Sequence, residues 1–178
     1  MTGSAAVVWL AVGLGCVIVC GGGAAWYQHQ LHRNDCRTST VTVEGNSMAP
    51  MIADGTNITI VSGGPQCAEP LARHAVVVVR NARHRLPLLK SLRGLPGDGF
   101  HLDGGHLFVN SAVVKNSAGQ VYDFANTGFA MFAVYAQDYA ATIPADTYLV
   151  LGDDAHGSLD SSQLGLVARE DIIGRRVD

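Results

Sequence analysis

Thr38-Ser39-Thr40-Val41-Thr42-Val43 and Asn57-Ile58-Thr59-Ile60-Val61 are two short runs rich in β-branched residues. Such side chains favour extended backbone, so each run predicts a β-strand. The residues between the runs include Gly45, Pro50 and the pair Asp54-Gly55, which are typical of turns. The two runs therefore predict neighbouring strands joined by a long turn.

The same pattern continues along the rest of the chain. Turn-forming residues such as Asp103-Gly104-Gly105 separate the runs, and no long amphipathic helix interrupts them. Further strands are predicted at residues 75–80, 86–92, 99–102, 106–110, 147–151 and 172–177. The predicted fold class is therefore mainly β, with an antiparallel β-sheet as its framework.

The turn between the first two strands reads Gly45-Asn46-Ser47-Met48-Ala49-Pro50. A serine between glycine and proline is ordinarily a turn residue. It becomes a nucleophile when a nearby base removes its proton, and Gly45 would let a substrate carbonyl approach the backbone closely. Met48, Met51 and Ile52 crowd this turn with apolar side chains, and we expect them to contact a bound peptide.

A single lysine lies in the strand predicted at residues 86–92, just before the corner Gly94-Leu95-Pro96-Gly97-Asp98. Side chains alternate along a strand, so Lys90 shares a face with Leu88 and Leu92. Burial among leucines lowers the pKa of an amine, and a neutral amine can act as a general base. The alternative is a lysine whose stem lies along apolar surface while its amine stays in water. With this corner beside Lys90 we favour the catalytic interpretation, since serine–lysine pairs are a known variant of the serine triad.

Residues 45–50, 90–98 and 152–165 together resemble three sequence boxes of the bacterial type I signal peptidases, which are membrane-bound serine proteases with a Ser–Lys dyad. The boxes occur in the family's order, and the resemblance extends from about residue 41 to residue 174. Met51 stands where the family usually has threonine, and the second box fits without a gap. The resemblance implies that Ser47 is the nucleophile and Lys90 its base, and that no cofactor takes part. It also implies that the substrates are preproteins with small residues before the cleavage site.

The resemblance implies supporting roles for other residues. In the family, the N–H of the serine helps to form the oxyanion hole. Gly45 occupies the place where some members carry a hydroxyl, so the donors here would be backbone groups. Ser158 matches a serine that hydrogen-bonds the lysine, and Asp153 and Asp160 match structural carboxylates.

The arginines that pair with these carboxylates in the family are replaced in this chain. Ser91 and Ser162 occupy the two places. Arg93 lies two residues after Ser91 and therefore on the same face of the strand. We expect Arg93 to pair with Asp153 or Asp160.

Histidine offers a rival chemistry, because His156 lies close in sequence to Asp153 and Asp154 and a Ser–His–Asp triad can be drawn. Related eukaryotic enzymes place their histidine at the lysine's position, which here is Lys90. We therefore interpret His156 as a loop residue.

Neither a metal nor nucleic acid is predicted as a partner. His101 and His106 flank a turn without metal-ligand spacing. The net charge of −3 comes with no basic stripe of the kind that binds nucleic acid.

The first 32 residues contain no Asp, Glu, Lys or Arg, and residues 5–26 are almost wholly apolar or small. About 20 such residues cross the hydrocarbon core of a lipid bilayer, so we predict one transmembrane helix that anchors the protein. The alternative, a cleavable signal peptide, expects a basic start and a shorter apolar core. The predicted domains are thus residues 1–32 with the anchor and residues 33–178 as the peptidase domain.

The orientation of the anchor follows from the resemblance and not from charge. Arg33 and Arg37 follow the span, and the positive-inside rule alone would leave the domain in the cytoplasm. Signal peptidases cut on the far side, so we expect a single-pass protein of the cell membrane with an extracytoplasmic peptidase domain. In that oxidising compartment Cys36 and Cys67 would form a disulfide bridge or remain two free thiols.

Three functions are open from the sequence. The first is an endopeptidase that removes signal peptides from translocated preproteins. The second is a specialised maturation peptidase for pilin or conjugation proteins. The third is a catalytically weak, membrane-anchored relative that binds translocated chains.

Overall fold

The structure is a computed structural model that describes residues 36–81, 86–124, 132, 134 and 141–178. These residues belong to one unit, Arg33–Asp178. Within the described ranges, none of the helices has the length and apolarity to cross a bilayer. The span predicted at residues 5–26 lies outside these ranges, as does the domain of residues 1–32, and both stay predictions.

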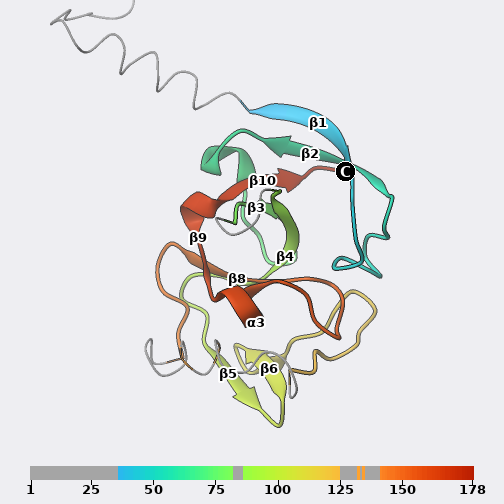
Figure 1. Cartoon of the computed structure of the whole chain (residues 1–178). Coiled ribbons are helices and arrows are strands. Elements are labelled where there is room, and N and C mark those ends of the chain that lie inside the picture. Colours follow the sequence, from blue (N-terminus) through green and yellow to red (C-terminus); the bar gives the residue numbers. More distant parts are fainter. Residues whose placement is uncertain (1–35, 82–85, 125–131, 133, 135–140) are drawn as a thin grey trace, which may run out of the picture. The chain divides into compact units, whose positions relative to one another are not determined.

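The framework of the described domain is an antiparallel sheet of seven strands in the order β1-β2-β10-β3-β4-β8-β9 (Figure 1). Its strands are β1 (Arg37–Thr42), β2 (Asn57–Ser62), β3 (Val76–Val79), β4 (Leu88–Gly94), β8 (Thr147–Leu151), β9 (Val167–Ala168) and β10 (Ile172–Arg176). The first predicted pair forms as expected, with Val41 opposite Ile58. The prediction of a mainly β, antiparallel fold is confirmed.

A smaller sheet lies at the other end of the domain from β1 (Figure 1). It consists of β5 (Phe100–Asp103), β6 (His106–Val109) and β7 (Ala112–Val113). The described helices are short: η1 (Pro65–Ala68), α3 (Ser161–Leu164) and η2 (Arg169–Asp171).

The core is built around β3, whose four valines are all buried. Val76 and Val78 pack in one cluster with Ile58 and Ile60, whereas Val77 and Val79 pack in another with Leu92 and Val150. A third cluster, which contains Phe100, Leu107 and Leu149, lies under the smaller sheet. Because β3 has apolar contacts on both faces, it holds its neighbour β4 in a fixed position.

A disulfide bond joins Cys36 to Cys67, with a Cα–Cα distance of 5.5 Å. Cys36 directly precedes β1, an edge strand with mostly exposed side chains, and Cys67 lies in η1. The bond therefore fastens the start of the edge strand to a helix outside the sheet.

Candidate active site

Ser47 lies in a turn that its own hydrogen bonds hold in shape. Gly45 has a φ of +87°, a conformation that favours glycine, and its N–H donates to Asp54 Oδ1 at 2.8 Å. The N–H of Ile52 donates to the carbonyl oxygen of Met48 at 2.7 Å. The Met48 side chain is fully buried in the cluster that contains Ile58. Met48 thus packs the turn onto the core, and Ser47 lies beside Lys90.

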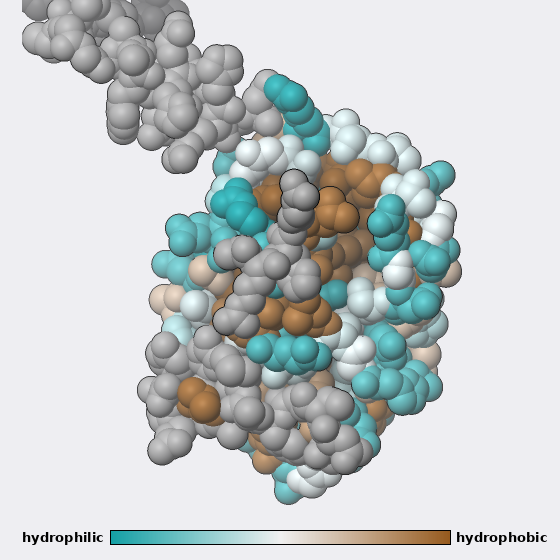
Figure 2. All heavy atoms as spheres, viewed as in Figure 1, coloured by the Kyte–Doolittle hydropathy of each residue, from teal (hydrophilic) through white to brown (hydrophobic). Residues whose placement is uncertain are grey.

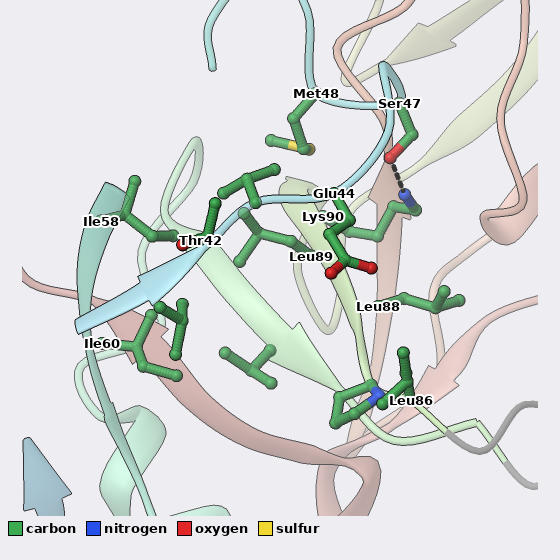
Figure 3. Close-up of a pocket in the computed structure, with 14 residues that line it drawn as sticks. Thr42, Glu44, Ser47, Met48, Ile58, Ile60, Leu86, Leu88, Leu89 and Lys90 are labelled. Atoms are coloured by element: carbon green, nitrogen blue, oxygen red, sulfur yellow. Dashed lines mark hydrogen bonds between the residues drawn. The ribbon is translucent and has the colours of Figure 1, made fainter. Parts of the chain in front are cut away.

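Lys90 lies in β4 opposite Val77 of β3. Its Nζ lies 2.9 Å from Ser47 Oγ, and the two groups are hydrogen-bonded (Figure 3). Only 1% of the Lys90 surface is exposed. Burial lowers the pKa of its amine, and the charge of Asp160 opposes that shift by raising it. The lysine is therefore biased toward the neutral form, which has a lone pair that can accept the hydroxyl proton.

The chain beyond β8 packs directly against the serine turn. The carbonyl oxygen of Ser47 accepts hydrogen bonds from the N–H groups of Asp153 at 2.8 Å and Asp154 at 3.3 Å. A Cβ on Gly152 would lie 2.4 Å from that oxygen and 2.2 Å from Ser158 Oγ. Such contacts are too short for any side chain, so only glycine allows this approach.

The carboxylate of Asp153 is fully buried and connects four segments of the chain. It forms an ion pair with Arg93, whose Nη2 lies 3.0 Å from Asp153 Oδ1. It also accepts hydrogen bonds from the N–H of Met51 at 3.0 Å and the N–H of Ser117 at 2.9 Å, and from the Ser117 hydroxyl. Of the two partners expected for Arg93, the structure provides Asp153.

Asp160 organises the residues next to Ser158. The hydroxyl of Ser158 donates to Asp160 Oδ2 at 2.5 Å, and the N–H of Gly152 donates to the same oxygen at 2.9 Å. The other oxygen of Asp160 accepts from the N–H of Ser162 and caps α3. The resemblance implied a bond from Ser158 to the lysine, whereas the structure directs the Ser158 hydroxyl to Asp160.

A groove of about 690 Å³ opens beside Ser47 and Lys90. Apolar side chains dominate its walls, and Figure 2 shows hydrophobic residues gathered in a hollow on this face of the domain. The described lining residues are Val41, Thr42, Val43, Glu44, Ser47, Met48, Ile58, Ile60, Val78, Leu86, Pro87, Leu88, Leu89 and Lys90. The end of β1 and the start of β4 thus form two of its walls, with the serine at one end.

Met48, Met51 and Ile52, which are expected to contact substrate, lie in different places. Met48 lines the groove. Ile52 is buried in the core and is not among the lining residues. Met51 borders a second cavity of about 740 Å³ beside Arg93. The apolar crowding around the serine serves mainly to pack the turn onto the core, a role that the sequence alone does not separate from substrate contact.

Comparison with known proteins identifies the family of the chain. The family described as "Signal peptidase, peptidase S26" matches residues 35–177. The chain belongs to this family. It is 28% identical over 135 residues to signal peptidase I U of Bacillus subtilis (strain 168), covering 74% of this chain and 70% of that protein. It is 26% identical over 166 residues to signal peptidase I of Streptococcus pneumoniae serotype 4 (strain ATCC BAA-334 / TIGR4), covering 76% of this chain and 78% of that protein.

A solved structure of a signal peptidase I from Enterococcus faecalis V583 also matches. It is 19% identical, with a TM-score of 0.39, and the match covers 57% of this chain and 92% of that chain.

Two residues that the sequence does not single out support the site of this S26 peptidase. The Tyr122 hydroxyl donates to the carbonyl oxygen of Gly152 at 2.6 Å and accepts from Arg93 at 3.4 Å. Burial raises the pKa of Tyr122 to about 12, so the hydroxyl remains a donor. His74 Nδ1 lies 2.8 Å from Arg93 Nη1, and burial, with the charges of Arg93 and Arg73, lowers the pKa of this histidine. Both residues lie outside the three boxes, so no motif in the sequence indicates their roles.

The rival histidine is in an exposed loop of the S26 domain. The side chain of His156 is 88% exposed, and its Nδ1 lies 3.3 Å from Asp154 Oδ1. The structure therefore pairs Ser47 with Lys90, while His156 contacts a residue of its own loop. No group of three metal-ligating side chains occurs within the described part of the chain.

Proposed function

We propose that this protein is a membrane-anchored serine endopeptidase that removes N-terminal signal peptides from translocated preproteins. The observation that carries the proposal is the buried Lys90 amine, 2.9 Å from the Ser47 hydroxyl at the end of an apolar groove. Membership of the S26 family and the names of the relatives support the choice of substrate. The apolar residues 5–26 would hold the enzyme in the membrane.

The chemistry follows from the dyad. Neutral Lys90 removes the proton of Ser47 as Oγ attacks the carbonyl carbon of the scissile peptide bond. The tetrahedral intermediate collapses, Lys90 gives the proton to the leaving amine, and the signal peptide remains as an ester on Ser47. Water then attacks the ester with Lys90 as base, which releases the signal peptide and restores the hydroxyl.

The oxyanion of each intermediate needs donors at the serine turn. The N–H of Ser47 is the proposed donor, and its position is fixed because the Ser47 carbonyl is held by the N–H groups of Asp153 and Asp154. Gly45 has no side chain to contribute, so all donors from this turn are backbone groups. Asp153, Asp160 and Ser158 act as positioning residues that hold the segment beyond β8 against the dyad.

The substrate would bind as an extended peptide between the end of β1 and the start of β4, in the manner of an added strand. Met48 would form part of the floor near the cut. The small residues expected before the cleavage site follow from the resemblance to signal peptidases.

The test is incubation of the full chain in detergent with a preprotein that has alanine at the first and third positions before the cut. Mass spectrometry of the product gives the cleaved bond. We expect cleavage after alanine and little cleavage when phenylalanine replaces it. Ser47→Ala and Lys90→Ala should each lower kcat by roughly three orders of magnitude or more while the melting curve persists.

Because the dyad acts as a unit, the double variant should be little slower than either single variant. Near-normal turnover in either single variant would overturn the proposed dyad. A well-folded wild-type chain that cleaves no preprotein would instead favour the non-catalytic relative.

A further inference from the structure

Glu44 is an acidic side chain in an otherwise apolar groove. It is exposed and lines the groove that contains Ser47. Among the described lining residues it is the one carboxylate, and most of the others are aliphatic. In Figure 3 its side chain points toward the part of the groove bordered by Leu86 and Leu88. A carboxylate in this position affects any peptide that lies along the groove.

The charge of Glu44 is not neutralised by the described part of the protein. Within that part, no hydrogen bond or ion pair reaches its side chain. The nearest candidate cation in the groove, Lys90, is occupied by its hydrogen bond to Ser47. Burial also lowers the pKa of Lys90 and so favours its neutral form. None of the described residues therefore competes with a cation on the ligand for the carboxylate of Glu44.

The position of Glu44 limits which substrate residue it reaches. Glu44 precedes Ser47 by three residues, so even a fully extended chain separates their Cα atoms by at most about 10 Å. An extended substrate that lies along the same wall advances by about 3.3 Å per residue. The substrate residue directly opposite Glu44 therefore lies within about three positions of the cleaved bond.

We propose that Glu44 is a specificity-determining residue that selects substrates with a lysine or arginine within three residues of the cut. The inference rests on the proposed peptidase function and adds a charge preference to it. Complementarity supports it: the groove offers apolar walls for the rest of the peptide and one negative charge near the scissile bond that no described residue pairs with. The pair is exposed, so its effect is on the scale of a surface ion pair.

The experiment uses the full chain in detergent and a series of peptides with alanine at the first and third positions before the cut. Lysine, glutamine or glutamate is placed in turn at each other position within three residues of the cut, and kcat/KM is measured. At one of these positions we expect the kcat/KM of the lysine peptide to exceed that of the glutamine peptide by roughly two- to fivefold. The kcat/KM of the glutamate peptide should be lower than that of the glutamine peptide by a similar factor.

Variants of the protein test whether Glu44 causes the preference for lysine over glutamine and glutamate. Glu44→Gln should bring the lysine-to-glutamine ratio close to one, and Glu44→Lys should reverse the preference in favour of glutamate. Glu170→Gln, which removes the same charge from an exposed residue of η2 outside the groove, should keep the wild-type ratio. The preference should also weaken between about 10 mM and about 1 M salt, because salt screens exposed charges.

Equal rates for lysine and glutamine at every position would overturn the inference, as would a lysine preference that survives in Glu44→Gln. In both cases cleavage that still depends on Ser47 leaves the proposed peptidase function intact. A wild-type chain that cleaves none of the peptides and no preprotein overturns the function itself.

Discussion

Lys90 shows how the fold changes the chemistry of one residue. A lysine in water is a cation at neutral pH, but burial lowers the pKa of this one from its ordinary value of 10.5. Below its pKa in the native protein, Lys90 is an ammonium ion that cannot accept the proton of Ser47. Above that value it is the base that the proposed mechanism needs.

The first prediction is therefore a pH profile in which kcat/KM rises with pH along a limb whose midpoint lies below 10.5. Initial rates for a neutral peptide across the pH range give the midpoint directly. A limb centred at or above the ordinary lysine value would contradict a buried, neutral base. The Glu170→Gln variant, altered in η2 outside the groove, should reproduce the wild-type midpoint.

The same burial makes the stability of the domain depend on pH. Between the pKa of Lys90 in the native state and 10.5, the unfolded chain binds a proton that the native protein does not. The free energy of unfolding therefore rises with pH through this window. Lys90→Met removes this titrating group. In urea unfolding, the free energy of unfolding of the variant should therefore lack this rise with pH, and the variant should also lose activity.

Arg93 is the second residue whose role is set by burial. It is almost fully buried and pairs with the buried carboxylate of Asp153. Arg93→Ala leaves that carboxylate without its cation and should cost about 3–5 kcal/mol of unfolding free energy, with a loss of activity. Arg93→Lys should recover only part of both, because an ammonium group lacks the planar geometry of the guanidinium.

Urea unfolding and kcat/KM on the same samples check this prediction. Arg176→Ala is the control, since Arg176 forms a more exposed ion pair with Asp178 and its loss should cost under about 1 kcal/mol. An Arg93→Ala variant as stable as Arg176→Ala would show that the pair with Asp153 is not needed for the fold.

At the scale of elements, the site depends on contact between the serine turn and the segment that follows β8. Gly152 marks the closest approach, because a Cβ there would meet the backbone oxygen of Ser47 at 2.4 Å. Backbone cannot rotate away as a side chain can, so the two elements must move apart if Gly152 carries a side chain.

We predict that Gly152→Ala lowers kcat/KM by about 100-fold, since a displacement of about 1 Å at a catalytic group has effects of this size. The matched control is Gly99→Ala, because a Cβ at Gly99 has its nearest neighbours at 3.9 Å. Both variants are assayed on one preprotein, with melting temperatures measured alongside. Equal rates for the two variants would contradict the close approach.

Local sequence patterns predict some of the strands and miss others. Runs such as residues 57–61 predict their strands because β-branched side chains act locally. The two-residue strands β7 and β9 escape prediction, since hydrogen bonds to distant partners define them and no periodicity can appear over two residues. The hydrogen-bond partner of the Ser158 hydroxyl is also hard to predict. It depends on where Asp160 lies in the folded chain and not on the type of residue at position 158.

At the scale of the whole molecule, the order of the strands is the feature that the sequence conceals. β10, the last strand, inserts between β2 and β3, which come early in the chain (Figure 1). The residue types at Ser47 and Lys90 and the family resemblance were sufficient to propose the dyad. Met48 and Ile52 were harder to interpret, because a buried anchor and a substrate contact require the same apolar side chains.

The disulfide is a whole-molecule feature with a testable contribution. It closes a loop of 31 residues between Cys36 and Cys67, for which the chain-entropy model gives about 3.5 kcal/mol of stabilisation. We predict that a reducing agent lowers the free energy of unfolding of the wild-type domain by that amount, which appears as a lower urea midpoint. The double variant Cys36→Ser, Cys67→Ser should unfold at the reduced midpoint with or without reductant. Coincident midpoints for the oxidised and reduced wild type would contradict the prediction.

The same bond decides how mechanical force enters the domain. Any pull on the residues before Cys36 reaches Cys67 through the bond, and η1 is fastened by Arg169 to the carbonyl of Pro65 at 2.7 Å and by Arg175 to the carbonyl of Glu69 at 2.8 Å. Without the bond, tension would act on the first residue of β1 and peel that strand from β2 one hydrogen bond at a time. With it, tension is diverted into the helix before it reaches β1, and the strand whose end forms a wall of the groove keeps its shape.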